Sequence, residues 1–233
     1  MALPRVLLVH GSAADHTTWS IQLASRALRA RFELVAYDRR ADALTVEEHA
    51  ADALARAGDA RCTIVGSSFG AVIALEALRT APARFADAIL IEPPMGASDD
   101  AAAAPAAFLA DYDRIAAERG GPAAAEFFLR TVLGDAAVER MPRAYRDRAI
   151  SKWAEIRADS AALIAYRPRY RDLGHVDVPV QLLGGARSAP YFRPTLDALA
   201  AALPRATLEI VPNAGHMLHA EAHRRFAEIL LAR

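Results

Sequence analysis

The chain has 233 residues, enough for one domain with a sizeable buried core. Its 28 basic and 28 acidic residues give a net charge of +0, so nothing suggests nucleic acid or an anionic membrane as a partner. A single cysteine, Cys62, excludes an intramolecular disulfide. The apolar run over residues 6–9 is too short for a signal-peptide core and no stretch is long enough to cross a bilayer, so we expect a cytoplasmic protein.

Strands and helices alternate over the first 95 residues. The continuous apolar run over residues 6–9 is typical of a strand buried on both faces, as in a parallel sheet. Thr45 and Glu48 form a capping-box pattern at the start of a helix. In chain order we expect a strand over 6–9, a helix over 19–30, a strand over 32–36, a helix over 45–58, a strand from 62 followed by a helix to about 80, and a strand over 86–91.

The pattern changes between residues 96 and 174. This stretch is helical, rich in alanine, broken by prolines and without a convincing strand; within it, residues 101–107 are low in complexity, typical of a linker or a helix start. Alternation then resumes with a strand over 178–183, a helix over 194–203, a strand over 207–211 and a helix over 220–231.

Alternating strands and helices favour an α/β fold with a mainly parallel sheet and right-handed crossovers. Six strands are expected, and the helical stretch separates the fourth from the fifth. We therefore predict a core made of residues 1–95 and 176–233, with residues 96–175 inserted as a helical lid.

A serine lies between a β-branched strand and an alanine-rich helix, in the sequence Gly66-Ser67-Ser68-Phe69-Gly70. A sharp strand-to-helix turn leaves no room for side chains at positions 66 and 70, which explains the glycines. The turn would expose the Ser68 hydroxyl at a helix N-terminus, where free N–H groups favour negative charge. An ordinary turn serine is the simpler alternative.

A serine hydroxyl needs a base to become a nucleophile, and His216 is the obvious candidate. It follows the last strand, and in a parallel sheet the carboxyl ends of all strands meet at one edge, so Ser68 and His216 can converge there. His219 and His223 would face solvent or support the loop. A metal cluster of these three histidines is conceivable, but the spacing suggests no carboxylate or cysteine ligand.

Taken together, four motifs make the chain resemble the α/β-hydrolase family over essentially its whole length. These are His10-Gly11, Tyr37-Asp38-Arg39-Arg40, Gly66-Ser67-Ser68-Phe69-Gly70 and Gly215-His216, in the family's order. The resemblance implies that Ser68 is the nucleophile and His216 the base, without a cofactor or metal. It also implies an oxyanion hole formed by the backbone N–H groups of Phe69 and Ser12.

The acid of the triad departs from the family's common pattern. The turn after the strand that follows the lid holds no carboxylate, and Ser188 stands where an aspartate is expected. Glu92 is the best replacement because it directly follows the strand next to the nucleophile strand, at the same sheet edge. The alternative is a Glu92 side chain in solvent at the lid hinge; Asp38, Asp177 and Asp197 are weaker candidates.

These residues favour a serine hydrolase that cleaves a small ester, thioester or lactone through an acyl-enzyme. Hydrolysis of a C–C bond in a diketone uses the same residue types and stays open, as does a non-hydrolytic member of the fold that binds a small molecule. The expected partner is a small apolar carbonyl substrate. Aromatic residues of the lid are expected to form its core, and lid arginines such as Arg148 to form a solvated face.

Overall fold

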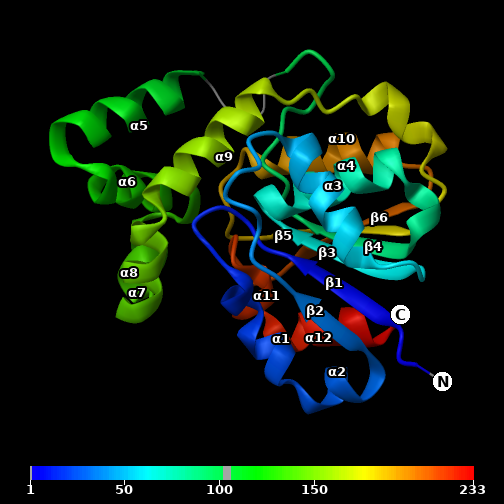
Figure 1. Ribbon diagram of the computed structural model, residues 1–233. Coiled ribbons are helices and arrows are strands. Elements are labelled where there is room, and N and C mark those ends of the chain that lie inside the picture. The colour runs from blue at the N-terminus through cyan, green and yellow to red at the C-terminus, as the bar shows by residue number, and fades with distance from the viewer. Residues whose placement is uncertain (1, 102–105) are drawn as a thin grey trace.

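The computed structural model describes residues 2–101 and 106–233, and a six-stranded sheet lies at its centre (Figure 1). All its neighbouring strands pair in parallel, in the order β2-β1-β3-β4-β5-β6, which confirms the predicted sheet. The strands are β1 (Arg5–Val9), β2 (Glu33–Ala36), β3 (Cys62–Ser67), β4 (Phe85–Ile91), β5 (Val180–Gly185) and β6 (Ala206–Val211).

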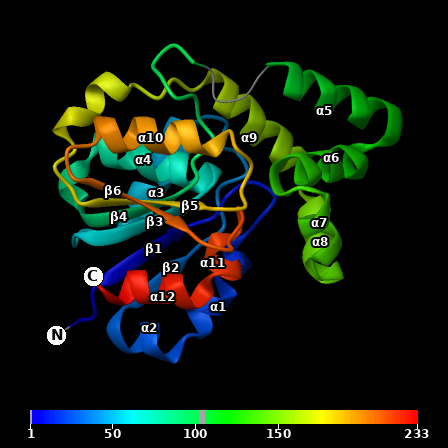
Figure 2. The same ribbon diagram turned by 180° about the vertical axis from the view of Figure 1, so that it is seen from behind.

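Helices cover both faces of this sheet (Figures 1 and 2). Strand β1 shows why: Leu7 and Val9 enter the hydrophobic core on one face, while Val6 and Leu8 enter the core on the other. One face is covered by α3 (Val46–Ala57), α4 (Phe69–Thr80) and α10 (Phe192–Ala202), and the other by α1 (Ser20–Ala24), α2 (Arg26–Arg31) and α12 (His223–Leu231).

Several element boundaries follow the predicted signals, and two helices are broken. Helix α3 has the expected capping box between Thr45 and Glu48. The helix expected over 19–30 is divided because Ser25 has an extended backbone and its hydroxyl accepts the N–H of Leu28, which starts a new helix. The last helix is likewise divided, at Ala222, into α11 (Leu218–Glu221) and α12.

A helical segment joins β4 to β5 and extends beyond the end of the sheet where the strands terminate (Figures 1 and 2). It has small cores of its own, one around Tyr112 and Ile156 and one around Leu129 and Val138. Part of the low-complexity stretch, residues 102–105, lies outside the described residues. The helices are α5 (Ala106–Arg119), α6 (Gly121–Leu133), α7 (Asp135–Arg140), α8 (Arg143–Ser151) and α9 (Trp153–Ala165).

The helical segment is tied to the core at its end. Tyr166, which follows α9, donates its hydroxyl proton to the buried Glu76 of α4 at 3.0 Å, and Arg79 pairs with the same carboxylate. Between residues 96 and 174 the described part of the chain forms no strand, as predicted. Throughout the described ranges, every helix is too short or too polar to cross a membrane.

Candidate active site

Ser68 occupies a strained turn between β3 and α4. Its backbone has φ 56° and ψ −125°, a conformation that non-glycine residues rarely adopt, and helix α4 begins at the next residue. A Cβ atom at Gly66 would lie 2.3 Å from the carbonyl oxygen of Gly70, and one at Gly70 would lie 2.3 Å from that of Val9. The two glycines therefore allow the backbone packing that presents Ser68 at the sheet edge.

The imidazole of His216 binds the carboxylate of Glu92. The Nδ1 and Oε2 atoms are 2.6 Å apart, and the side chains are only 4% and 1% exposed. The second carboxylate oxygen of Glu92 accepts the backbone N–H of Gly185 at 2.7 Å. Because both oxygens are engaged, the carboxylate has one orientation, with Nδ1 of His216 in contact.

Two further features describe the surroundings of the His216 ring. Phe192 of α10 stacks on it, with ring centroids 4.4 Å apart and an interplanar angle of 12°. The Nε2 atom of His216 is buried and has no hydrogen-bond partner within the described ranges. A contact between Nδ1 and a carboxylate keeps the proton on Nδ1, so Nε2 is left as a free acceptor on the other side of the ring.

Ser68 and His216 both line one cavity of about 600 Å³. The loop after β1, including Gly11 and Ser12, forms part of its wall, and a Cβ atom on Gly11 would lie 2.9 Å from Cβ of Ser68. The helical segment supplies an apolar wall made of Phe128, Leu129, Val132, Leu133, Met141 and Pro142. The cavity can therefore hold a small, largely apolar molecule against Ser68.

The loop after β1 is held by His10, which is 2% exposed. Its Nε2 atom accepts the backbone N–H of Arg39 at 3.3 Å, so the proton is on Nδ1, which donates to the carbonyl oxygen of Gly11 at 2.8 Å. Burial and the charge of Arg39 lower the pKa of His10 to about 4, so the ring is neutral at pH 7.

His219 is fully buried, so of the two positions expected from the sequence it does not take the one that faces solvent. Its Nε2 atom lies 3.1 Å from the hydroxyl of Thr18, and its ring packs on Trp19 with centroids 4.5 Å apart. Burial is the main reason why the pKa of His219 falls to about 3. It thus supports the His216 loop, whereas His223 is exposed.

One group of potential metal ligands occurs among the residues that the structure describes, and it is not the histidine cluster considered from the sequence. It consists of Asp15, His16 and Asp38, of which the last two are exposed. Asp15 already accepts the N–H and hydroxyl of Thr17, and Asp38 binds His16 through the backbone and the ring. These contacts explain the cluster without a metal.

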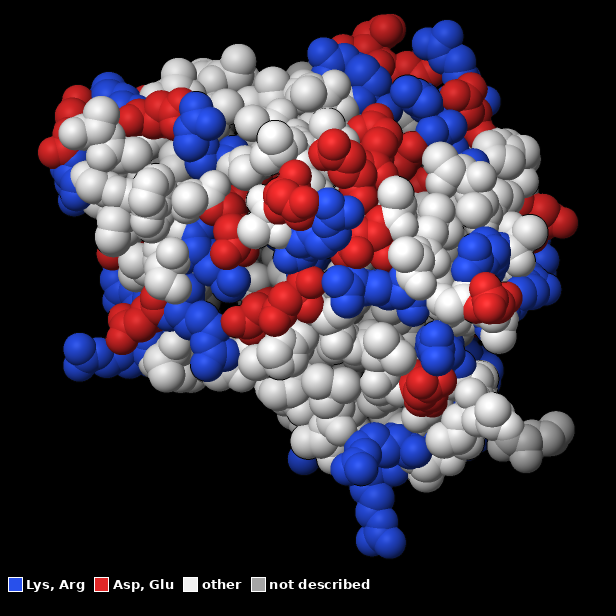
Figure 3. Space-filling view, in the orientation of Figure 1, with Lys and Arg blue, Asp and Glu red and all other residues white. Residues whose placement is uncertain are grey.

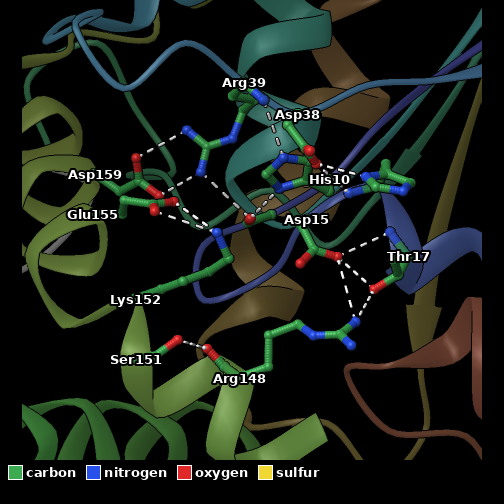
Figure 4. Close-up of polar contacts among 12 residues, drawn as sticks. His10, Asp15, Thr17, Asp38, Arg39, Arg148, Ser151, Lys152, Glu155 and Asp159 are labelled. Atoms are coloured by element: carbon green, nitrogen blue, oxygen red, sulfur yellow. Dashed lines mark hydrogen bonds and ion pairs between the residues drawn. The ribbon is translucent and has the colours of Figure 1, made fainter.

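Sequence reasoning missed three charged residues near the site. Arg39 belongs to one of the four motifs, but the sequence assigns no role to it, and nothing in the sequence marks Asp159 within its helix. The two residues form a buried ion pair (Figure 4). Arg148, expected on a solvated face, lines the cavity and donates to the hydroxyl of Thr17 at 2.5 Å. No sequence signal connects these partners, since 120 and 131 residues separate them.

The family model described as the alpha/beta hydrolase family matches residues 6–229 of the chain. The chain belongs to the alpha/beta hydrolase family. This confirms the resemblance drawn from the four motifs, and with it the fold class and the assignment of the protein as a hydrolase. No curated protein matches the chain in sequence.

Solved structures of hydrolases share the fold of this alpha/beta hydrolase at low sequence identity. The enol-lactonase from Burkholderia xenovorans has a TM-score of 0.81 and 20% identity, over 100% of this chain and 91% of its own. A thermophilic esterase from Thermogutta terrifontis has a TM-score of 0.76 and 24% identity, over 98% and 88%. A hydrolase from Oleispira antarctica has a TM-score of 0.79 and 17% identity, over 100% and 92%.

Proposed function

We propose that this alpha/beta hydrolase is a serine hydrolase that cleaves a small ester, thioester or lactone through an acyl-enzyme on Ser68. One observation carries the proposal: the ring of His216 is bound to Glu92 through Nδ1 and lines the cavity that also contains Ser68. An imidazole held through Nδ1 in this way presents Nε2 as a general base.

In the proposed reaction, Ser68 Oγ attacks the substrate carbonyl and His216 Nε2 takes its proton. Glu92 balances the charge that develops on the imidazole. The backbone N–H groups of Phe69 and Ser12 bind the oxyanion of the tetrahedral intermediate. His216 then gives the proton to the leaving group, and a water molecule hydrolyses the acyl-enzyme by the same steps.

Ser68 Oγ and His216 Nε2 do not form a hydrogen bond with each other, since Nε2 has no partner among the described residues. Such bonds are often long before substrate binds, and the serine side chain can rotate about a single bond. Residues 96–175 are proposed to act as the lid of a core made of residues 1–95 and 176–233. The apolar cavity wall that α6 contributes supports this role, and it favours substrates with an apolar acyl group.

The proposal is tested with Ser68→Ala and a chromogenic short-chain ester. We expect the variant to lose turnover by a factor of about 10³ or more, with an unchanged circular dichroism spectrum, because the attacking atom is absent. A fluorophosphonate probe should label the wild type and not the variant. Ser151→Ala, an exposed serine on α8, is the matched control and should retain both properties. Equal activity of Ser68→Ala and the wild type would refute an acyl-enzyme on Ser68.

A further inference from the structure

A buried ion pair joins helix α9 to the loop that follows β2 (Figure 4). The guanidinium of Arg39 binds both carboxylate oxygens of Asp159, at 2.9 and 2.7 Å, and the two side chains are 6% and 4% exposed. Removing two charges from water is costly, and separating them would leave a buried charge without a partner. The two hydrogen bonds therefore hold both groups in one arrangement. Asp159 thereby holds the Arg39 side chain in place from the helical segment.

The same guanidinium touches both sides of the expected oxyanion hole. On one side, Nη2 of Arg39 donates to the carbonyl oxygen of Gly11 at 3.4 Å. On the other, the guanidinium carbon lies 4.8 Å from the ring centroid of Phe69. Arg39 thus lies between the loop that carries Ser12 and the first residue of α4.

The contact with Gly11 has a geometric consequence for Ser12. The peptide between Gly11 and Ser12 is trans, as are all described peptide bonds, and in a trans peptide the C=O and N–H groups point in opposite directions. His10 Nδ1 and Arg39 Nη2 both hold the Gly11 oxygen on one side. The N–H of Ser12 therefore points away from the side on which His10 and Arg39 lie, and Ser12 lines the same cavity as Ser68.

We propose that Asp159 is a positioning residue that acts through Arg39 to hold the oxyanion hole of this enzyme. The helical segment then does more than enclose the substrate. It supplies the carboxylate that, through Arg39, keeps the N–H groups of Ser12 and Phe69 in the positions from which both can bind the oxyanion. The inference rests on the proposed serine-hydrolase function, because it assigns these contacts to stabilisation of the tetrahedral intermediate.

The decisive variant is Asp159→Asn, which keeps the size of the side chain and removes its charge. With active sites counted by fluorophosphonate titration, we expect kcat to fall about 10- to 100-fold and KM to change less than about threefold, because oxyanion contacts strengthen in the transition state. The affinity for an alkyl boronic acid, whose serine adduct is tetrahedral and anionic, should fall by the same factor as kcat/KM.

The chain offers a matched control in a second ion pair, which joins α9 to α5. Arg157 and Asp113 also form a bidentate pair, at 2.7 and 2.9 Å, but both side chains are exposed and neither lines the cavity. Asp113→Asn should leave kcat, KM and boronate affinity unchanged. If Asp159→Asn behaves like Asp113→Asn, or lowers only the titrated fraction of active sites or only raises KM, the inference is overturned.

Two further variants separate a positioning role from a folding defect. Arg39→Lys keeps the charge but lacks the planar fork that reaches Asp159 and Gly11 together, so it should lower kcat and boronate affinity as Asp159→Asn does. In Asp159→Ala, added formate should restore kcat at least about fivefold by occupying the vacated carboxylate position. A wild type that neither turns over esters nor reacts with the probe would refute the proposed function itself, whereas an active wild type with no kcat effect in these variants refutes only the positioning role.

Discussion

The carboxylate of Glu92 comes from the residue that directly follows β4. The conformation of its backbone explains how the side chain reaches His216. Glu92 has φ 44°, and its N–H donates to the carbonyl oxygen of Leu183 at 3.1 Å, which holds the residue against β5. There, a Cβ atom on Gly185 would lie 2.5 Å from the carbonyl oxygen of Ala214 and 2.6 Å from that of Gly215, so a glycine at this position lets the loop that carries His216 pack against the end of β5. A glutamate from β4 can thus reach His216, and Ser188 keeps a buried hydroxyl that has no partner among the described residues.

Replacing Glu92 by glutamine tests its role in the proposed reaction. Glu92→Gln preserves the shape of the side chain but removes the charge that would balance the imidazolium and fix the tautomer of His216. We expect kcat to fall by a factor of about 10² to 10⁴, measured with a chromogenic ester at pH 7.5. Asp38→Asn is the control, since Asp38 is largely exposed and binds His16. An equal effect of the two substitutions would show that Glu92 is not the acid.

At the scale of elements, the β3–α4 unit determines where the candidate nucleophile lies. Strand β3 is buried along its whole length, and ten of the twelve residues of α4 are buried. The turn between them approaches β1 so closely that Gly70 packs against the carbonyl oxygens of Val9 and His10. This close packing holds the end of β1, and with it the start of the loop that contains Gly11 and Ser12, beside Ser68.

The packing predicts a large stability cost for Gly70→Ala. The new Cβ atom would lie 2.3 Å from one backbone oxygen and 2.6 Å from another, and neither belongs to a flexible side chain. We expect the free energy of unfolding to fall by about 3 kcal/mol, measured by urea denaturation. Gly174→Ala, where nothing lies within 4 Å of the added atom and φ is not positive, should change it by less than about 0.5 kcal/mol. Similar stabilities for the two variants would contradict this account of the turn.

At the scale of the whole molecule, charges are spread over the surface while several histidines are buried inside. Figure 3 shows acidic and basic side chains intermixed over most of one face, in keeping with a net charge of +0. Inside, burial is the largest cause of the lowered pKa of His10, about 4, and of His219, about 3. Arg39 lowers the pKa of His10 further, and His216 that of His219.

These histidines predict a loss of stability in mild acid. Between pH 6.5 and 5 the unfolded chain binds protons on both residues and the folded chain does not, so the free energy of unfolding decreases as the pH falls. Each histidine should contribute about 2 kcal/mol to this decrease. Urea denaturation at pH 7.5 and 5.0 measures it. His219→Gln should show a smaller decrease than the wild type, and the exposed control His223→Gln the same decrease; a wild-type stability independent of pH over this range would contradict the prediction.

The order of the strands and helices, and the residues able to carry out chemistry, can be predicted from the amino-acid sequence alone. Apolar runs such as residues 6–9 are typical of strands buried on both faces, and the glycines at positions 66 and 70 mark a turn that admits no side chain. Local signals also predicted the capping box of α3 correctly. They did not predict the breaks at Ser25, which caps the next helix with its hydroxyl, and at Ala222, where the backbone leaves the helical conformation (φ −113°, ψ 40°).

Which groups distant in the sequence come into contact depends on the packing of the folded chain. The sequence favours Glu92 as the acid because of its position after β4, but the 2.6 Å contact with His216 depends on how the end of β4 and the last loop pack together, and 124 residues separate them. The pair of Arg39 and Asp159 gives no signal in the sequence, because arginines and aspartates are common on protein surfaces, and the burial of this pair is set by how α9 packs on the loop after β2. Local preferences act over a few residues, whereas electrostatic partners and cavities are produced by the packing of the whole chain.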